Sequence, residues 1–86
     1  MAMHQSRRKI DALDSQLLEL LARRLEICKK ISDYKKKNNL PIRDRGRELE
    51  IIKNRIETFK GLGFDDPEFI TELFELVMKK SRKVQQ

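Results

Sequence analysis

The sequence predicts an all-α fold of one long and two shorter helices, which associates with a second copy as a homodimer. Apolar residues recur every three to four positions along most of the 86 residues, which is the period of a helix. Glycine and proline occur only within residues 41–67, so they divide the chain into three stretches. A single domain of this length, 1–86, buries only about 60–65% of its unfolded surface, so association with a second copy is a common source of stability.

The first helix is predicted over residues 5–38. Neither glycine nor proline interrupts it, and its apolar residues share one face: Ile10, Leu13, Leu17, Leu20, Ile27, Ile31 and Tyr34. At 1.5 Å per residue the helix is about 51 Å long, which exceeds the width of a domain of this size. It must therefore project into solvent or pack against a second chain, and its heptad-like spacing favours the second chain.

Two further helices follow clear boundary signals. Residues 38–41 (Asn-Asn-Leu-Pro) end the first helix, because asparagine tolerates a left-handed C-cap and proline cannot continue the ladder. Asp44 is the predicted N-cap of a helix over about 45–60, which residues 61–63 (Gly-Leu-Gly) terminate in a loose connection. Residues 66–68 (Asp-Pro-Glu) then start a third helix over about 67–84. Its inward residues are predicted to be Ile70, Leu73, Phe74, Val77 and Val84.

The composition limits the classes of site and partner. The formal net charge of +6 admits an anionic metabolite or a nucleic acid. Cys28 is the only cysteine, which excludes an intramolecular disulfide and predicts a buried thiol in a reducing compartment. His4 is the only histidine, and no residue cluster has metal-ligand spacing, so we expect no metal. No stretch resembles a membrane span or a leader, so we expect a cytoplasmic location and no membrane partner.

Polar residues interrupt the apolar faces of all three helices. Arg24 falls between Leu20 and Ile27, Lys35 ends the same face, and Glu48 leads the face formed by Ile52, Ile56 and Phe59. Ser81 and Gln85 interrupt the apolar face of the third helix. A charge on a buried face is costly unless it is paired. These five residues therefore predict a polar pocket inside the bundle, and its cations predict a small anion as ligand.

Each of these residues also has a plainer interpretation. Arg24 and Lys35 lie about 16 Å apart along one side of the helix, where they either bind one dianion or extend their charges into water. Lys35 also begins a run of three lysines, and such runs are usually solvated. Ser81 can donate back to the carbonyl of Val77, and Gln85 lies in a final turn that can fray.

Three more residues have two interpretations each. Arg7 lies 28 residues before Lys35, about 42 Å along a straight helix, so it either reaches a partner's site or is a peripheral arginine. Asp44 can cap a helix and still belong to a site. Arg47 and Glu48 can form an exposed ion pair of little energetic value.

Taken together, these segments resemble the all-helical class of chorismate mutase over nearly the whole chain, and the resemblance implies that family's fold, an intertwined helical homodimer with crossing long helices. Residues 7–14 (Arg-Arg-Lys-Ile-Asp-Ala-Leu-Asp) resemble the family's Arg-x-x-Ile-Asp-x-Leu-Asp start, and residues 20–24 its Leu-Leu-x-x-Arg run. Lys35 follows eleven residues later, as in the family. Residues 41–48 (Pro-Ile-Arg-Asp-Arg-Gly-Arg-Glu) resemble its Pro-(Val/Ile)-x-Asp-x-x-Arg-Glu signature. Ser81 and Gln85 have the spacing of the family's last two site residues.

The resemblance implies a reaction, the Claisen rearrangement of chorismate to prephenate in the biosynthesis of Phe and Tyr. This intramolecular reaction needs no metal or cofactor, so catalysis comes from conformational restriction and electrostatic stabilisation. The resemblance implies that Lys35 and Gln85 donate hydrogen bonds to the ether oxygen. Arg24, with Arg7 contributed by the other chain of the dimer, would bind the substrate carboxylates.

The resemblance also implies roles for the remaining site residues. Arg47 would help form the site, while Glu48 and the backbone at Asp44 would hold the ring hydroxyl of the substrate. Ser81 would form a hydrogen bond near a carboxylate. Residues 45–46 (Arg-Gly) depart from the family by adding a cation and a flexible residue, which predicts a looser site.

Three alternatives remain at the level of sequence. An isochorismate–pyruvate lyase shares the fold and much of the site, although Arg47 and Glu48 after Pro-Ile-Arg-Asp favour the mutase. A basic helical module that binds nucleic acid is supported by the net charge and by the cations in residues 35–37 and 79–83. It lacks helix-turn-helix or zinc-finger spacing, so we expect no nucleic-acid partner. The third alternative is a helical dimerisation domain without catalytic activity.

Overall fold

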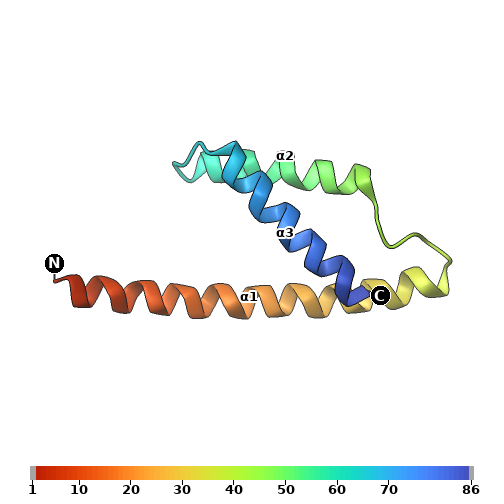
Figure 1. The fold of residues 1–86 in the computed structure, drawn as a ribbon, viewed down its shortest axis with the longest axis horizontal. Coiled ribbons are helices and arrows are strands. Elements are labelled where there is room, and N and C mark those ends of the chain that lie inside the picture. The colour runs from red at the N-terminus through yellow and green to blue at the C-terminus, as the bar shows by residue number, and fades with distance from the viewer. Residues whose placement is uncertain (1, 86) are drawn as a thin grey trace.

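A computed structural model describes residues 2–85, and these residues form three helices (Figure 1). Helix α1 spans Met3–Lys37, α2 spans Arg45–Gly61 and α3 spans Pro67–Gln85. The described residues contain no strand, so the predicted all-α class with one long and two shorter helices is confirmed. The starts of α2 and α3 are those predicted, and the other four helix boundaries differ from the predicted ones by one or two residues.

Helix α1 ends in a Schellman motif. Asn39 has a φ of 54°, the left-handed conformation that asparagine tolerates better than most residues. The amide of Leu40 donates to the carbonyl of Lys35 at 2.8 Å, and the amide of Asn39 donates to that of Lys36 at 3.4 Å. The chain then turns away from α1, and Asp44 caps α2 by accepting a hydrogen bond from the amide of Arg47 at 3.0 Å.

The connection between α2 and α3 is tighter than the sequence predicts. Gly63, with a φ of 102°, donates to the carbonyl of Lys60, and Phe64 donates to that of Phe59 at 3.2 Å. This is a second Schellman motif, and the rings of Phe59 and Phe64 stack with centroids 5.3 Å apart in its usual apolar contact. The predicted loose turn is therefore wrong, because these bonds fix it. Asp66 then caps α3 by accepting from the amide of Phe69 at 3.1 Å.

The three helices enclose little interior. Helix α3 crosses from the end of α2 to the C-terminal half of α1 and packs against both helices, whereas the N-terminal half of α1 extends away from them (Figure 1). The chain measures 55 × 24 × 16 Å. Its radius of gyration is 16.0 Å, well above the roughly 12 Å expected for a compact chain of this length. One copy therefore leaves much of α1 without a packing partner.

The buried apolar residues are few and only partly those predicted. Among residues 2–85 they are Cys28, Ile51, Ile70 and Met78. Burial of Cys28 and Ile70 agrees with the prediction, whereas Ile51 and Met78 lie outside the predicted apolar faces. Leu73, predicted to face inward, is 38% exposed because α3 packs against α1 mainly through its C-terminal half. None of the helices in the described residues is both long and apolar enough to cross a membrane.

Two glycines at the end of α2 give a matched test of this corner. Gly63→Ala should destabilise the fold by about 1–2 kcal/mol, because an alanine at a positive φ is strained. Gly61→Ala should stabilise it by about 0.5–1 kcal/mol, because Gly61 is helical and a methyl group there meets nothing within 4 Å. Urea denaturation at one protein concentration measures the change in the free energy of unfolding for both variants. Equal effects at the two positions would contradict the assigned Schellman motif.

Candidate active site

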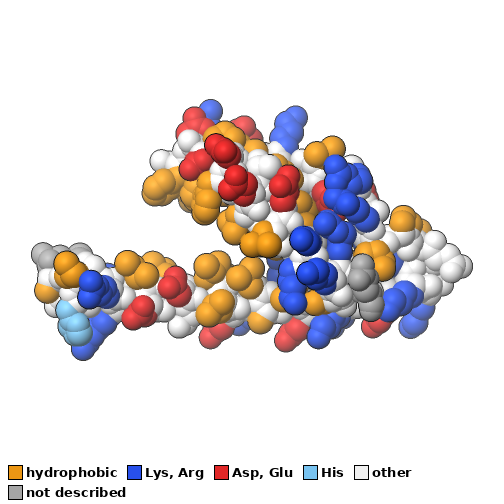
Figure 2. All heavy atoms as spheres, viewed as in Figure 1, with side chains coloured by type: hydrophobic (Ala, Val, Ile, Leu, Met, Phe, Trp, Pro, Cys, Tyr) orange, Lys and Arg blue, Asp and Glu red, His pale blue; other side chains and the backbone are white. Residues whose placement is uncertain are grey.

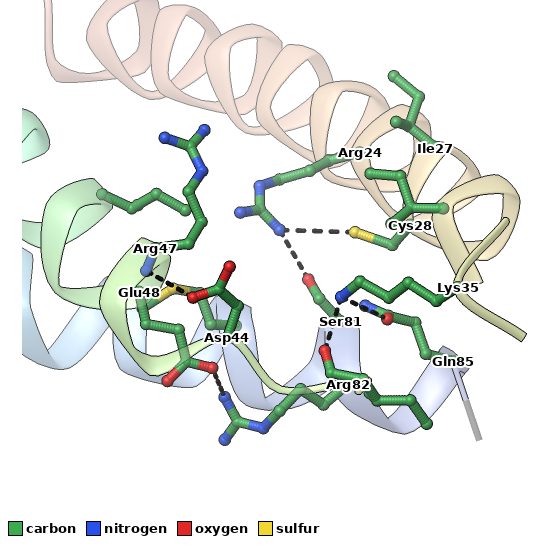
Figure 3. A pocket seen from close by; sticks show the side chains of 14 residues that line it. Arg24, Ile27, Cys28, Lys35, Asp44, Arg47, Glu48, Ser81, Arg82 and Gln85 are labelled. Carbon is green, nitrogen blue, oxygen red and sulfur yellow. Dashed lines mark hydrogen bonds and ion pairs between the residues drawn. The ribbon is translucent and has the colours of Figure 1, made fainter. Parts of the chain in front are cut away.

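A pocket of about 380 Å³ lies where the C-terminal half of α1, the start of α2 and the end of α3 meet (Figure 3). It brings together side chains from all three helices and from the link between α1 and α2. Seven of the eight predicted site residues line it: Arg24, Lys35, Asp44, Arg47, Glu48, Ser81 and Gln85. The polar pocket expected from the interrupted apolar faces therefore exists.

The ammonium group of Lys35 joins three segments of the chain. Its Nζ donates to the backbone carbonyl of Ile42 at 2.6 Å and to Oε1 of Gln85 at 3.3 Å (Figure 3). Lys35 is half-buried, whereas Lys36 and Lys37 are exposed, so a solvated charge run does not describe Lys35. An ammonium group has three N–H donors, and these two bonds leave the third available to a ligand in the pocket.

Gln85 is buried, at 6% exposure, so the frayed final turn considered from the sequence is wrong. Two bonds fix it. Its backbone carbonyl accepts a hydrogen bond from the hydroxyl of Ser32 at 2.8 Å, and its side-chain oxygen accepts from Lys35. A carbonyl in the last turn of a helix has no intrahelical donor, so Ser32 supplies the missing partner. Because Oε1 faces Lys35, the Nε2 group of Gln85 keeps its donors for other partners.

Arg24 is half-buried on α1 and contacts α3. Its Nη1 donates to Oγ of Ser81 at 2.6 Å and lies 3.9 Å from Sγ of Cys28 (Figure 3). The Ser81 hydroxyl in turn donates to the carbonyl of Val77 at 2.9 Å, as predicted from its position in the helix. The Ser81 hydroxyl thus forms two hydrogen bonds. It donates to its own helix, and it accepts from Arg24 and so orients the guanidinium. The other N–H groups of the guanidinium can serve an anion in the pocket.

Residues from the start of α2 form the opposite wall. Asp44 is tied to the amide of Arg47 as the helix cap. The alternative interpretation, an ion pair between Arg47 and Glu48, does not hold. Arg47 lies 3.8 Å from Glu50, and the carboxylate of Glu48 pairs with other arginines, most closely Arg82 at 2.6 Å. Neighbouring residues on a helix point about 100° apart, so adjacent charges rarely meet. Arg47 is 59% exposed and extends from α2 toward α1 in Figure 3.

Sequence reasoning missed three residues around the pocket. Ser32 and Cys28 share a face of α1 with Arg24 and Lys35, at spacings of three and four residues, so the helical period contained a signal for both. Arg82 carried no such signal, because it stands among basic residues that suit any helix C-terminus. Its role emerges only from its contact with Glu48.

Arg7 is the one predicted site residue that the chain does not bring to the pocket. It is exposed in the N-terminal part of α1, far from the pocket-forming end of that helix (Figure 1). This position agrees with the separation calculated from the sequence. Arg7 can act at a pocket of this kind only if the pocket belongs to another chain.

The charges around the pocket favour a dianion. Its lining includes the cations of Arg24, Lys35, Arg47 and Arg82, and the carboxylates of Asp44 and Glu48. Among the described residues, Arg24 and Lys35 are in no ion pair with a carboxylate, so these two positive charges remain for a ligand. The remaining wall is apolar and includes Ile27, Ile31, Ile42, Ile51 and Met78. Such a pocket suits a small anionic molecule with an apolar part.

Residues 6–86 match the family model described as chorismate mutase type II. The chain is 38% identical over 80 residues to the bifunctional chorismate mutase/prephenate dehydratase of Escherichia coli (strain K12), a match that covers 93% of this chain and 20% of that protein. It is 35% identical over 75 residues to the T-protein of Enterobacter agglomerans, covering 87% and 20%. The chain thus spans about a fifth of the length of these curated relatives.

A solved structure has a similar fold over its full length. It is a conserved hypothetical protein from Pyrococcus furiosus, with a TM-score of 0.76 and 35% sequence identity. The match covers 100% of both chains.

Ser32 offers a test of how the pocket is assembled. Ser32→Ala should destabilise the protein by about 1–3 kcal/mol, because the buried carbonyl of Gln85 loses its donor. Ser15→Ala is the matched control, since Ser15 lies on the same helix, is exposed and only donates back to Asp11. Its effect should stay below about 0.5 kcal/mol. Denaturation curves that shift equally for both variants would contradict the role of Ser32.

Proposed function

This chain belongs to the chorismate mutase type II family, and we propose that its pocket catalyses the rearrangement of chorismate to prephenate. The observation that carries the proposal is the pair formed by Lys35 and Gln85, from α1 and α3, held together at the pocket. The reaction breaks an ether bond and forms a carbon–carbon bond within one molecule. Negative charge grows on the ether oxygen as the bond breaks, so a site with two fixed donors lowers the barrier.

We assign the ether oxygen to Lys35 and Gln85. The third N–H of Lys35 and the amide N–H groups of Gln85 are the donors that their mutual bond leaves available. Both side chains are fixed before substrate arrives, Lys35 by the Ile42 carbonyl and Gln85 by the burial of its helix turn. Donors that need no reorganisation during the reaction stabilise the transition state most effectively.

The other residues bind and orient the substrate. Arg24, fixed by Ser81, binds one carboxylate, and Arg47 closes the pocket from α2. Ser81 lies beside that carboxylate. At the ring hydroxyl, the carboxylate of Glu48 accepts a hydrogen bond and the backbone at Asp44 donates one. Holding both carboxylates and the hydroxyl restricts the substrate to its reactive conformer, which removes much of the entropic cost of reaction.

We further propose that two copies form an intertwined dimer in which Arg7 of each completes the other's pocket. Apolar side chains along the N-terminal half of α1 are exposed, including Ile10 at 56%, Leu13 at 61% and Leu17 at 55%. Figure 2 shows hydrophobic side chains along α1 facing the open space beneath the α2–α3 corner. An apolar hollow of about 510 Å³ continues this surface between α1 and α3. A contiguous apolar surface of this kind is typical of a subunit interface.

Lys35→Ala tests the catalytic assignment. Turnover should fall by at least about a hundredfold, because one preorganised donor to the developing charge is lost. Lys36→Ala removes the same charge from an exposed neighbour and should retain wild-type turnover. The assay follows chorismate loss and prephenate formation, with isochorismate as a second substrate to detect lyase activity. Sedimentation verifies that each variant keeps its assembly state. Wild-type turnover by Lys35→Ala would refute the role of Lys35.

A mixing experiment tests the shared site. Arg7→Ala and Arg24→Ala chains should each be nearly inactive, but random exchange between them should restore about a quarter of wild-type sites, because each heterodimer has one complete pocket. Mixing Arg24→Ala with Lys35→Ala is the control, since both residues come from the same chain at each pocket and no complete site forms. Demonstrated exchange without recovery in the first mixture would refute the shared site.

A further inference from the structure

The carboxylate of Glu48 is held by three arginines from three segments. Its Oε2 pairs with Nη1 of Arg82 on α3 at 2.6 Å (Figure 3). Its Oε1 lies 3.3 Å from Nε of Arg43 in the link after α1 and 3.9 Å from Nη1 of Arg45, the first residue of α2. Arg82 thereby ties the end of α3 to the start of α2.

The pair with Arg82 differs from the other two in distance and in burial. The side chains of Arg82 and Glu48 are 21% and 14% exposed, whereas those of Arg43 and Arg45 are 47% and 66% exposed. Exposed pairs contribute little because water and salt screen them. A short pair in a partly buried place is screened less and has a more fixed geometry. Arg82 is therefore the residue that decides where the carboxylate of Glu48 lies.

Compensation of the helix dipole does not explain Arg82. The same end of α3 also carries Lys79, Lys80 and Lys83, all of which are exposed. Any of them supplies the positive charge that a helix C-terminus favours. Arg82 alone among these cations is half-buried, and it also lines the pocket. A guanidinium in that place suggests a role at the site.

We propose that Arg82 is a positioning residue, which fixes the Glu48 carboxylate so that it accepts a hydrogen bond from the ring hydroxyl of the substrate. This inference rests on the proposed function. A carboxylate has about four acceptor positions, and the hydrogen bonds from Arg43 and Arg82 leave acceptor positions for the substrate. Ser81, the preceding residue, orients Arg24. Ser81 and Arg82, which are adjacent on α3, thus orient the side chains through which α1 and α2 contact the substrate.

Assays of Arg82 variants with two substrates distinguish a loss of positioning from a general loss of charge or stability. The variants are Arg82→Met, Arg82→Lys and the control Lys83→Met, which removes an exposed charge one residue further along α3. The substrates are chorismate and an analogue that lacks the ring hydroxyl. Arg82→Met should lower kcat/KM for chorismate by at least about tenfold, mainly through KM, since a hydrogen bond to a charged group is lost. For the analogue, which keeps both carboxylates, kcat/KM should stay unchanged.

Arg82→Lys keeps the charge and should show the same selective loss at a smaller size, so the test stands even if Arg82→Met fails to assemble. Lys83→Met should match the wild-type protein on both substrates. In the background of Glu48→Gln, Arg82→Met should cause no further loss, because both changes remove one interaction.

The outcomes distinguish this inference from the proposed function. Equal losses on the two substrates, additive losses with Glu48→Gln, or wild-type kinetics in both Arg82 variants would overturn the positioning role alone. Absence of chorismate turnover by the wild-type protein would overturn the proposed function and the role of Arg82 with it. A selective, non-additive loss would support both.

Discussion

The bonds of the Lys35 ammonium group are the constraint on which the site depends. One nitrogen joins α1 to the Ile42 carbonyl in the link and to Gln85 at the end of α3. The link fixes where α2 begins, and the end of α3 fixes where Ser81 and Arg82 lie. A half-buried cation is stable here because carbonyl and amide oxygens surround it. The same bonds that satisfy the charge therefore preorganise the pocket.

The chain uses much of its small interior for polar groups. Among residues 2–85, the buried residues comprise four apolar side chains and the polar Ser32, Ser81 and Gln85. Each buried polar group must be paired, and hydrogen bonds between helices serve that need. A domain of this size gains little stability from such an interior, while α1 leaves its apolar face exposed. This small, partly polar interior thus explains both features: it forms the polar pocket, and it leaves the apolar face of α1 in need of a packing partner.

The sequence placed side chains correctly where helical geometry alone decides position. Arg24 and Lys35 face one pocket because eleven residues make about three turns. Arg7 lies far from them for the same reason. The expectations that failed concern places where two segments meet. The plainer interpretations of Glu48 and Gln85 do not hold, because Glu48 pairs with Arg82 rather than with Arg47 and Gln85 is buried rather than frayed. The predicted loose Gly-Leu-Gly corner is fixed. Each failure concerns a partner that lies on another helix or in a turn whose bonds the sequence does not display.

The sequence by itself determined the helices, their ends and the side of α1 on which its cations lie. These features depend on interactions within a few residues, such as the Asp44 cap and the left-handed Asn39. Only the tertiary structure decided which polar group pairs with which. Ser32 and Gln85 are 53 residues apart, and Glu48 and Arg82 are 34 apart. Such pairs form only when α3 crosses both other helices at one particular depth, and that depth is set by packing over the whole chain.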